Sequence, residues 1–360
     1  MYKDIRKKYE PKARYSVRNW AAYNKGHINR RNVTIWIDAT VFARILNALP
    51  SRTYAATSRA LLRARSRLIL WFSAGYAALL VGGFTGFVSP ADAQTAKLQV
   101  VAAENFYGDV IKQIGGANVA VTSILTNPDQ DPHLFEASPK TARALQHANL
   151  VVYNGADYDP WMAKLLAVSK NATRKTIVVA DLVGKKPGDN PHLWYNPITM
   201  PAAALAISAA LGTADPSHKA DYDANLDSFL ASLKSIDAKV AALRAQNRGV
   251  PVTATEPVFG YMSDAIGLEM HNLHFQLATM NDTEASASDI AAFEKDLRKH
   301  QVKALLYNSQ AEEPMTRRML KIAKDASVPI VSVTETQPVG KTFQQWMLTQ
   351  LDALGAALDL

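Results

Sequence analysis

The chain of 360 residues contains no cysteine. This absence excludes disulfide bonds, cysteine nucleophiles and the thiolate sites that hold structural zinc. It also excludes an acylated cysteine as a membrane anchor. The absence does not define a redox compartment, because many exported proteins have no disulfides. A metal site in this chain would have to use nitrogen and oxygen ligands.

The chain also has no basic excess outside its first quarter. Residues 1–93 carry 16 Lys and Arg against 4 Asp and Glu, a net charge of +12, whereas residues 94–360 have a net charge of −4. A folded part with a mildly acidic balance has no electrostatic reason to bind nucleic acid. The apolar content of 48% is ample for two hydrophobic cores.

Residues 68–91 contain no charged side chain and form a strongly apolar run. Arginines precede this run, and the small residues Ala91 and Ala93 flank Asp92 directly after it. The pattern predicts a secretory signal over residues 59–93 that is cleaved after Ala93. The run is also long enough to span a bilayer, so an uncleaved anchor over residues 68–91 is the alternative.

Residues 1–58 form a basic leader ahead of this signal. Residues 1–45 resemble the N-terminus of DDE-type insertion-sequence transposases, without any catalytic acid. A disordered basic tail is the alternative interpretation. We expect either a mobile-element remnant or an overextended start in front of a secreted precursor.

Short apolar runs alternate with helical patterns through the rest of the chain. Strands are predicted over 97–104, 119–125, 150–153 and 176–179, and again over 250–255, 303–307 and 328–333. Prolines at 139, 257 and 314 mark helix starts. This alternation predicts an α/β protein with mainly parallel sheets flanked by helices.

A long helix is predicted between the two sets of strands. Apolar residues recur at helical spacing over residues 216–247, with no Gly or Pro after Pro216. About thirty helical residues span roughly 45 Å, more than a compact domain usually needs. We therefore predict two lobes, 97–215 and 248–360, joined by one long rigid helix.

Four side chains stand where a loop or a strand end would present a metal ligand. They are His133 and His192, each preceded by proline, and Glu256 and Glu335, each following a predicted strand. Ligands in α/β sheets bind beyond the carboxyl ends of strands. Two imidazoles and two carboxylates complete a four-coordinate site for a divalent transition metal, contributed equally by the two lobes.

The other histidines have simpler interpretations. His147, His218 and His300 lie on polar helical stretches and are expected at the surface. His271 and His274 are three residues apart in a predicted strand or turn, where their side chains would point to opposite faces.

Residues 97–360 resemble the ZnuA-like family, the periplasmic zinc- and manganese-binding proteins of ABC transporters. The resemblance is carried by the long middle helix and by the motifs Asp131-Pro132-His133 with Glu136 and Pro139, 152–155, 190–194, 259–261 and 303–310. It implies two α/β lobes bridged by a long helix, with the metal bound in the cleft. It also implies delivery of the metal to a membrane permease and its ATPase subunit by a monomeric periplasmic protein.

The resemblance places the family's first two histidine ligands on His133 and His192. Its third ligand falls on Glu256, as in manganese-type members, and its fourth, usually aspartate, falls on the longer Glu335. The His-rich loop of some zinc members is replaced by residues 185–188, Lys-Lys-Pro-Gly. Oxygen ligands favour manganese, yet zinc outranks manganese at most N/O sites, so both Zn²⁺ and Mn²⁺ stay open as the transported ion.

A zinc-dependent hydrolase is the enzymatic alternative, since two histidines and a carboxylate hold a catalytic zinc in many enzymes. The sequence has no His-Glu-x-x-His motif. Glu312 and Glu313 precede Pro314 at a helix start, where acidic residues are expected anyway. We therefore predict a binding protein and not an enzyme.

Overall fold

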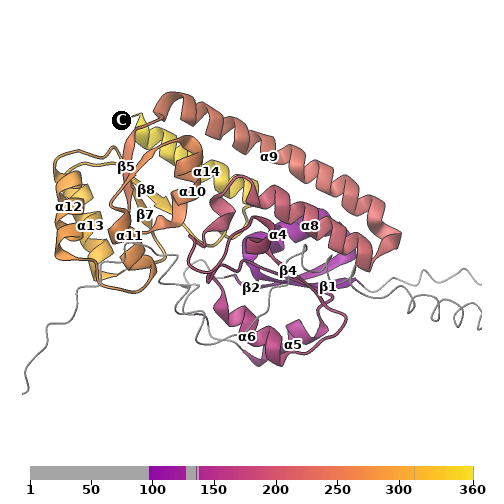
Figure 1. Ribbon diagram of the computed structural model, residues 1–360. Coiled ribbons are helices and arrows are strands. Elements are labelled where there is room, and N and C mark those ends of the chain that lie inside the picture. The colour runs from indigo at the N-terminus through magenta and orange to yellow at the C-terminus, as the bar shows by residue number, and fades with distance from the viewer. Residues whose placement is uncertain (1–96, 127–134, 136–137, 312, 360) are drawn as a thin grey trace, which may run out of the picture. The chain divides into compact units, whose positions relative to one another are not determined.

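The computed structural model describes residues 97–126, 135, 138–311 and 313–359, all within a compact unit that runs from Gln94 to Leu360. The predictions for the leader, the signal segment and His133 lie outside the described residues. Two four-stranded parallel sheets lie within this unit (Figure 1). The α/β architecture with two lobes is therefore confirmed.

The N-terminal sheet has the strand order β2-β1-β3-β4. Its strands are β1 (Leu98–Glu104), β2 (Val119–Leu125), β3 (Leu150–Tyr153) and β4 (Lys175–Val178). The helical segments of this lobe are α4 (Asn105–Gly115), η1 (Gly116–Asn118), α5 (Pro139–His147), α6 (Pro160–Val168), α7 (Val179–Leu182), η3 (Leu193–Tyr195) and α8 (Thr199–Ala214).

The C-terminal sheet repeats this topology in the order β6-β5-β7-β8. Its strands are β5 (Pro251–Ala254), β6 (Glu269–His271), β7 (Leu305–Asn308) and β8 (Ile330–Val333). The helical segments are η5 (Pro257–Phe259), α10 (Gly260–Ile266), α11 (Leu273–Met280), α12 (Ala287–Arg298), α13 (Pro314–Asp325) and α14 (Phe343–Leu358).

Both sheets are covered on two faces, which explains their nearly continuous apolar strands. In β1, Val100 and Ala102 belong to the same apolar cluster as α4 and α8, whereas Val101 and Ala103 pack with α5 and α6. Successive strand residues point to opposite faces, so each strand supplies two cores at once. Figure 1 shows α5 and α6 on the side of the N-terminal sheet opposite α4 and α8.

The long helix predicted between the lobes is present as α9 (Lys219–Asn247), 29 residues in length. Residues Pro216–His218 form a separate 3-10 turn, η4, so the α-helix begins three residues later than predicted. The start is fixed by Asp215, whose carboxylate lies 2.6 Å from His218 Nδ1 and accepts a hydrogen bond from the Tyr222 hydroxyl at 2.9 Å.

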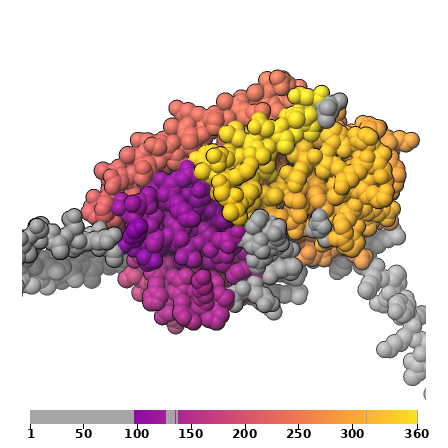
Figure 2. Space-filling model, turned by 180° about the vertical axis from the view of Figure 1, so that it is seen from behind, coloured from indigo at the N-terminus to yellow at the C-terminus, as the bar shows by residue number. Residues whose placement is uncertain are grey.

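One face of α9 packs along both lobes, on α4 and α8 of the first and on α10 and α14 of the second. Its buried apolar side chains are Tyr222, Phe229, Leu233, Ile236 and Leu243. The space-filling view shows α14, in yellow, lying against α9 and reaching the indigo N-terminal lobe (Figure 2). The lobes are therefore joined by packing as well as by the covalent chain.

Aromatic rings fill the junction of the lobes. The Phe106 ring lies 4.7 Å from Trp194 and 5.8 Å from Trp346, and the Tyr195 ring lies 4.8 Å from Phe259, between centroids. These residues belong to one apolar cluster that draws on both sheets. Such a junction fixes the two lobes against each other through dispersion and area burial.

Residues 269–280 differ from the prediction of one strand or turn. They form β6, which ends at His271, and α11, which contains His274. Asn272 adopts φ +59° between the two elements. His271 is no freely solvated side chain, because its Nδ1 lies 2.9 Å from the Asp296 carboxylate.

Among the residues that the structure describes, no helix combines the length and apolarity needed to cross a bilayer.

Candidate metal centre

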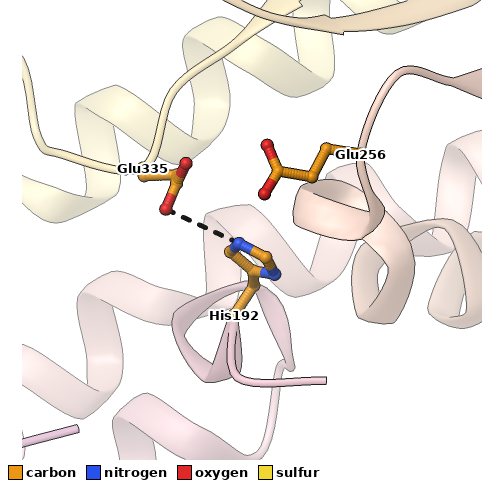
Figure 3. Close-up of side chains that lie close together, drawn as sticks. All are labelled: His192, Glu256 and Glu335. Carbon is orange, nitrogen blue, oxygen red and sulfur yellow. Dashed lines mark ion pairs between the residues drawn. The ribbon is translucent and has the colours of Figure 1, made fainter. Parts of the chain in front are cut away.

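Three of the four predicted ligands converge at the junction of the lobes. One ligand atom from each of His192, Glu256 and Glu335 lies within 4.8 Å of the other two. Figure 3 shows the imidazole facing the two carboxyl groups from the opposite lobe. The side chains are 0%, 4% and 1% exposed, respectively, so the group is buried. His133 lies outside the described residues.

Each of the two carboxylates follows a buried parallel strand. Glu256 comes two residues after β5 and precedes Pro257 of η5, while Glu335 comes two residues after β8. The strands β5 and β8 are separated by β7 in the sheet. Their carboxyl ends meet at the same edge, which is why residues far apart in the chain lie together.

His192 is oriented by Asn190. Its Nδ1 lies 2.7 Å from Asn190 Oδ1, which also accepts the backbone N–H of His192 at 3.1 Å. This partner holds the proton on Nδ1 and leaves the Nε2 lone pair as the donor for a metal. Nε2 lies 3.6 Å from Glu335 Oε2 and makes no hydrogen bond with the described residues.

Asn190 also ties the histidine loop to the opposite lobe. Its Nδ2 donates to Pro257 O at 2.8 Å, and its backbone carbonyl accepts a hydrogen bond from the Tyr261 hydroxyl at 2.8 Å. Lys185 lies over the same Tyr261 ring, 4.9 Å from its centroid. The position of His192 relative to Glu256 is therefore fixed by direct contacts across the junction.

The two carboxylates share one hydrogen-bond donor that sequence reasoning missed. Asn308, the last residue of β7, donates from Nδ2 to Glu256 Oε2 and to Glu335 Oε1, each at 2.7 Å. Its side chain is buried between the strands that carry the two glutamates. The sequence signal that could have found it is a polar residue directly after the apolar run 304–307.

Gln310 holds the backbone beside Glu335. Its Oε1 accepts the backbone N–H groups of Glu335 at 2.5 Å and Thr336 at 3.0 Å, and its Nε2 donates to Thr336 Oγ1 at 2.7 Å. Ligands anchored in this way lose little entropy when they bind an ion.

A second buried acidic pair lies close to this group in the N-terminal lobe. Glu104 and Asp159 are 0% and 2% exposed, and burial followed by the Asp159 charge raises the pKa of Glu104 well above its usual range. Burial likewise raises the pKa of Asp159 to about 6. The Asp159 carboxylate accepts the backbone N–H groups of Asn154 at 2.7 Å and Gly155 at 2.8 Å. One shared proton best satisfies such a pair.

Tyr158 stands between the acidic pair and the ligand group. Its ring lies 6.1 Å from the His192 ring, and burial followed by the charges of Glu335 and Glu104 raises the pKa of Tyr158 well above its usual range. The preceding residues Gly155, Ala156 and Asp157 all adopt positive φ. Left-handed backbone at non-glycine residues is held only where its surroundings enforce it.

The chemistry of the convergent group fits a divalent transition metal. Two carboxylates are costly to bury close together unless a cation compensates their charge. One imidazole nitrogen and two carboxylate oxygens supply three ligands of a four-coordinate site. The three ligands come from both lobes, His192 from the first and the two glutamates from the second.

The sequence as a whole matches a known family. Residues 100–357 match the family described as "Zinc-uptake complex component A periplasmic". The metal ABC transporter substrate-binding lipoprotein ScbA of Streptococcus cristatus is 25% identical over 292 residues, which cover 75% of this chain and 92% of ScbA. SloC of Streptococcus mutans, described in the same words, is 29% identical over 266 residues, which cover 69% of this chain and 84% of SloC.

Solved structures share the fold. The periplasmic zinc-binding protein TroA from Treponema pallidum superposes with a TM-score of 0.62 at 20% identity, over 73% of this chain and 99% of TroA. Zn(II)-bound AdcA from Streptococcus pneumoniae gives a TM-score of 0.58 at 20% identity, over 74% of this chain and 58% of AdcA. At this level of identity the likeness concerns the fold alone.

Two parallel α/β lobes with a buried N/O ligand group at their junction define a metal-binding solute-binding protein. The chain belongs to the ZnuA family of periplasmic zinc-uptake components, whose members bind solutes for metal transport and are not enzymes. The predicted family resemblance is confirmed, and binding is favoured over the hydrolase alternative.

Proposed function

We propose that this protein captures one divalent transition metal ion between its lobes, with His192, Glu256 and Glu335 as ligands and His133 as the fourth. The observation that carries the proposal is the convergence of three buried donors from both lobes within 4.8 Å. Because the ligands come from both lobes, the bound ion completes the junction. Release then requires the lobes or their loops to part.

Zinc is the ion that the ligand chemistry favours, and manganese is the competitor. Zinc binds N/O sites more tightly than manganese in the general affinity order of divalent metals. Relatives of both kinds exist, since PsaA of Streptococcus mitis is described as a manganese substrate-binding lipoprotein and TroA as zinc-binding. The ion that the cell loads depends on supply as well as on affinity.

The captured ion would pass to an ABC permease with its ATPase subunit. The family match and the transporter relatives support these partners. We propose that the protein acts as a monomer and that its mature part, residues 94–360, binds no nucleic acid, in keeping with its net charge of −4.

We propose export to the periplasm by the signal over residues 59–93, with cleavage after Ala93. The named relatives are lipoproteins, whereas this chain has no cysteine to acylate. In place of lipid attachment, the protein would be either cleaved and soluble or held in the membrane by an anchor over residues 68–91. Sequencing of the N-terminus of the exported protein distinguishes the two, since cleavage leaves Gln94 first.

Competitive titration of the purified protein with Zn²⁺ and Mn²⁺ tests the proposed function. One equivalent of either ion should bind, and Glu256→Ala should lose that binding while keeping the fold. Glu269→Ala is the matched control, because Glu269 is an exposed glutamate at the start of the neighbouring strand β6. Equal binding by wild type and Glu256→Ala would contradict the ligand assignment, and hydrolytic turnover by the metal-loaded protein would favour the enzymatic alternative.

A further inference from the structure

Asn308 occupies a position that decides how the two carboxylates present their oxygens. It ends β7, which lies between β5 and β8, and its side chain is 1% exposed. Both hydrogens of its amide are used, one on Glu256 Oε2 and one on Glu335 Oε1. One neutral donor thus satisfies two buried carboxylates that would otherwise repel each other.

The amide is itself held in one orientation. Asn308 Oδ1 accepts the backbone N–H of Gln310 at 3.0 Å, and the Asn308 backbone N–H donates to Thr255 Oγ1 at 3.1 Å. Turning the amide over would place Oδ1 against two carboxylates and Nδ2 against a backbone donor. These contacts therefore hold the Asn308 amide with both of its Nδ2–H groups directed at the glutamates.

Each carboxylate consequently has one oxygen on the side of Asn308. For Glu335 the second oxygen, Oε2, is the atom that lies 3.6 Å from His192 Nε2. For Glu256 the oxygen not bonded to Asn308 is Oε1. Glu335 Oε2 is therefore the Glu335 oxygen that a cation beside His192 would meet, and one ligand atom of Glu256 lies within 4.8 Å of those of His192 and Glu335.

The number of oxygens per carboxylate matters for the choice of ion. Zinc in four-coordinate sites takes one oxygen from each carboxylate ligand. Manganese prefers higher, octahedral coordination with more oxygen ligands, which a carboxylate supplies when both its oxygens bind. A donor that ties down one oxygen of each glutamate keeps the coordination number low.

We propose that Asn308 is a positioning residue that restricts Glu256 and Glu335 to ligation through one oxygen each and thereby increases the preference for zinc over manganese that N/O ligands already give. The inference rests on the proposed function, since it concerns the same metal site. The added preference for zinc is thus assigned to Asn308, which contacts both glutamates. The family resemblance alone suggests manganese, because Glu256 stands where manganese-type members have glutamate.

The test compares zinc and manganese affinities of wild type, Asn308→Ala and Asn308→Asp. Removing the amide frees the second oxygens, so the ratio of the manganese to the zinc dissociation constant should fall by about 10- to 100-fold in Asn308→Ala. Asn308→Asp should lower the ratio as well, since a carboxylate has no N–H groups to donate to the oxygens of the two glutamates. Asn247→Ala is the matched control, because Asn247 is also buried and its Nδ2 donates to Leu243 O, within α9.

X-ray absorption of the zinc-loaded proteins gives a readout that a merely structural role would not move. Wild type should show four ligands with one oxygen from each carboxylate, and Asn308→Ala should show additional oxygens near the zinc. An unchanged ratio and zinc environment in folded Asn308→Ala would overturn the inference. Two-oxygen ligation in wild type would overturn it even if the variants fail to fold. Wild type that binds neither ion would instead contradict the proposed function, and the inference with it.

Discussion

Asn105 and Gln337 exchange two hydrogen bonds across the junction of the lobes. Asn105 Nδ2 donates to Gln337 O at 2.7 Å, and Gln337 N donates to Asn105 Oδ1 at 3.0 Å. Asn105 begins α4 directly after β1, and Gln337 lies two residues beyond Glu335. The segment that carries Glu335 is thus bonded to the N-terminal lobe on one side and to Gln310 on the other.

Asn105→Ala should weaken the metal-free protein by about 1–2 kcal/mol, because it leaves two backbone groups of Gln337 without their partners. The free energy of unfolding in urea measures this loss. Asn171→Ala serves as a control, since Asn171 also bonds backbone carbonyls but lies in the N-terminal lobe away from the junction. Metal affinity should fall in Asn105→Ala and stay unchanged in Asn171→Ala, and equal affinities would contradict a role for the pair in holding Glu335.

Glu335→Gln should bind metal weakly and yet be at least as stable as wild type without metal. The substitution removes one of two buried negative charges but keeps the shape of the side chain. Thermal unfolding with and without zinc checks both parts. Wild type should gain about 4 kcal/mol at a thousandfold excess of zinc over the dissociation constant, and the variant should gain little. A variant stabilised as much as wild type would show that Glu335 is not a ligand.

Asn190→Ala should weaken zinc binding by about 10- to 100-fold without abolishing it, because His192 loses the partner of Nδ1 while the Tyr261 hydroxyl still holds the backbone carbonyl of residue 190. Competition with a chelator of known affinity measures the change. Asn190→Asp should retain more affinity than Asn190→Ala, since its carboxylate still accepts the Nδ1 proton. Equal losses in the two variants would assign the effect to the contacts of Asn190 Nδ2 and not to orientation of the histidine.

Stability should depend on pH through Glu104 and Asp159. Both carboxyls have raised pKa values in the folded protein, that of Asp159 from 3.8 to about 6, so the folded state keeps protons that the unfolded chain releases. The contribution is therefore fully present below the unfolded pKa values, near 4, and is lost as the pH rises through 6 and above.

Glu104→Gln tests this dependence, because the amide keeps the size and shape of the side chain but carries no titrating proton. Relative to wild type, the variant should gain stability between about pH 4.5 and about pH 7.5, as measured by urea unfolding of the metal-free proteins. A stability difference that is the same at both pH values would show that the pair does not share a proton. Asp181→Asn is a suitable control, since it removes an exposed carboxyl of the same lobe.

Local sequence patterns predicted most of the fold because the signals are local. Prolines begin α5, η5 and α13 as expected, and the apolar spacing of α9 gave its length to within three residues. Residues 269–280 were harder to predict, because a three-residue strand there is followed directly by a helix. Neither the two-residue period of a strand nor the 3.6-residue period of a helix lasts long enough to be recognised.

The residues of the candidate site likewise divide into those with a local sequence signal and those without one. His192, Glu256 and Glu335 could be proposed from prolines and strand ends, which are properties of a few adjacent residues. Asn308 could not be assigned a role, because that role depends on β7 lying between β5 and β8. The Glu104–Asp159 pair likewise depends on a non-local contact, between the end of β1 and the turn after β3.

If His192 and the two glutamates hold a metal ion in the exported protein, loss of the imidazole should remove that ion. Elemental analysis of the protein recovered from the periplasm, compared with His192→Ala and His271→Ala, tests it most directly. One equivalent of zinc or manganese is expected in wild type and in His271→Ala, whose imidazole pairs with Asp296 away from the site, and none in His192→Ala. Equal metal content in all three proteins, or none in wild type, would contradict it.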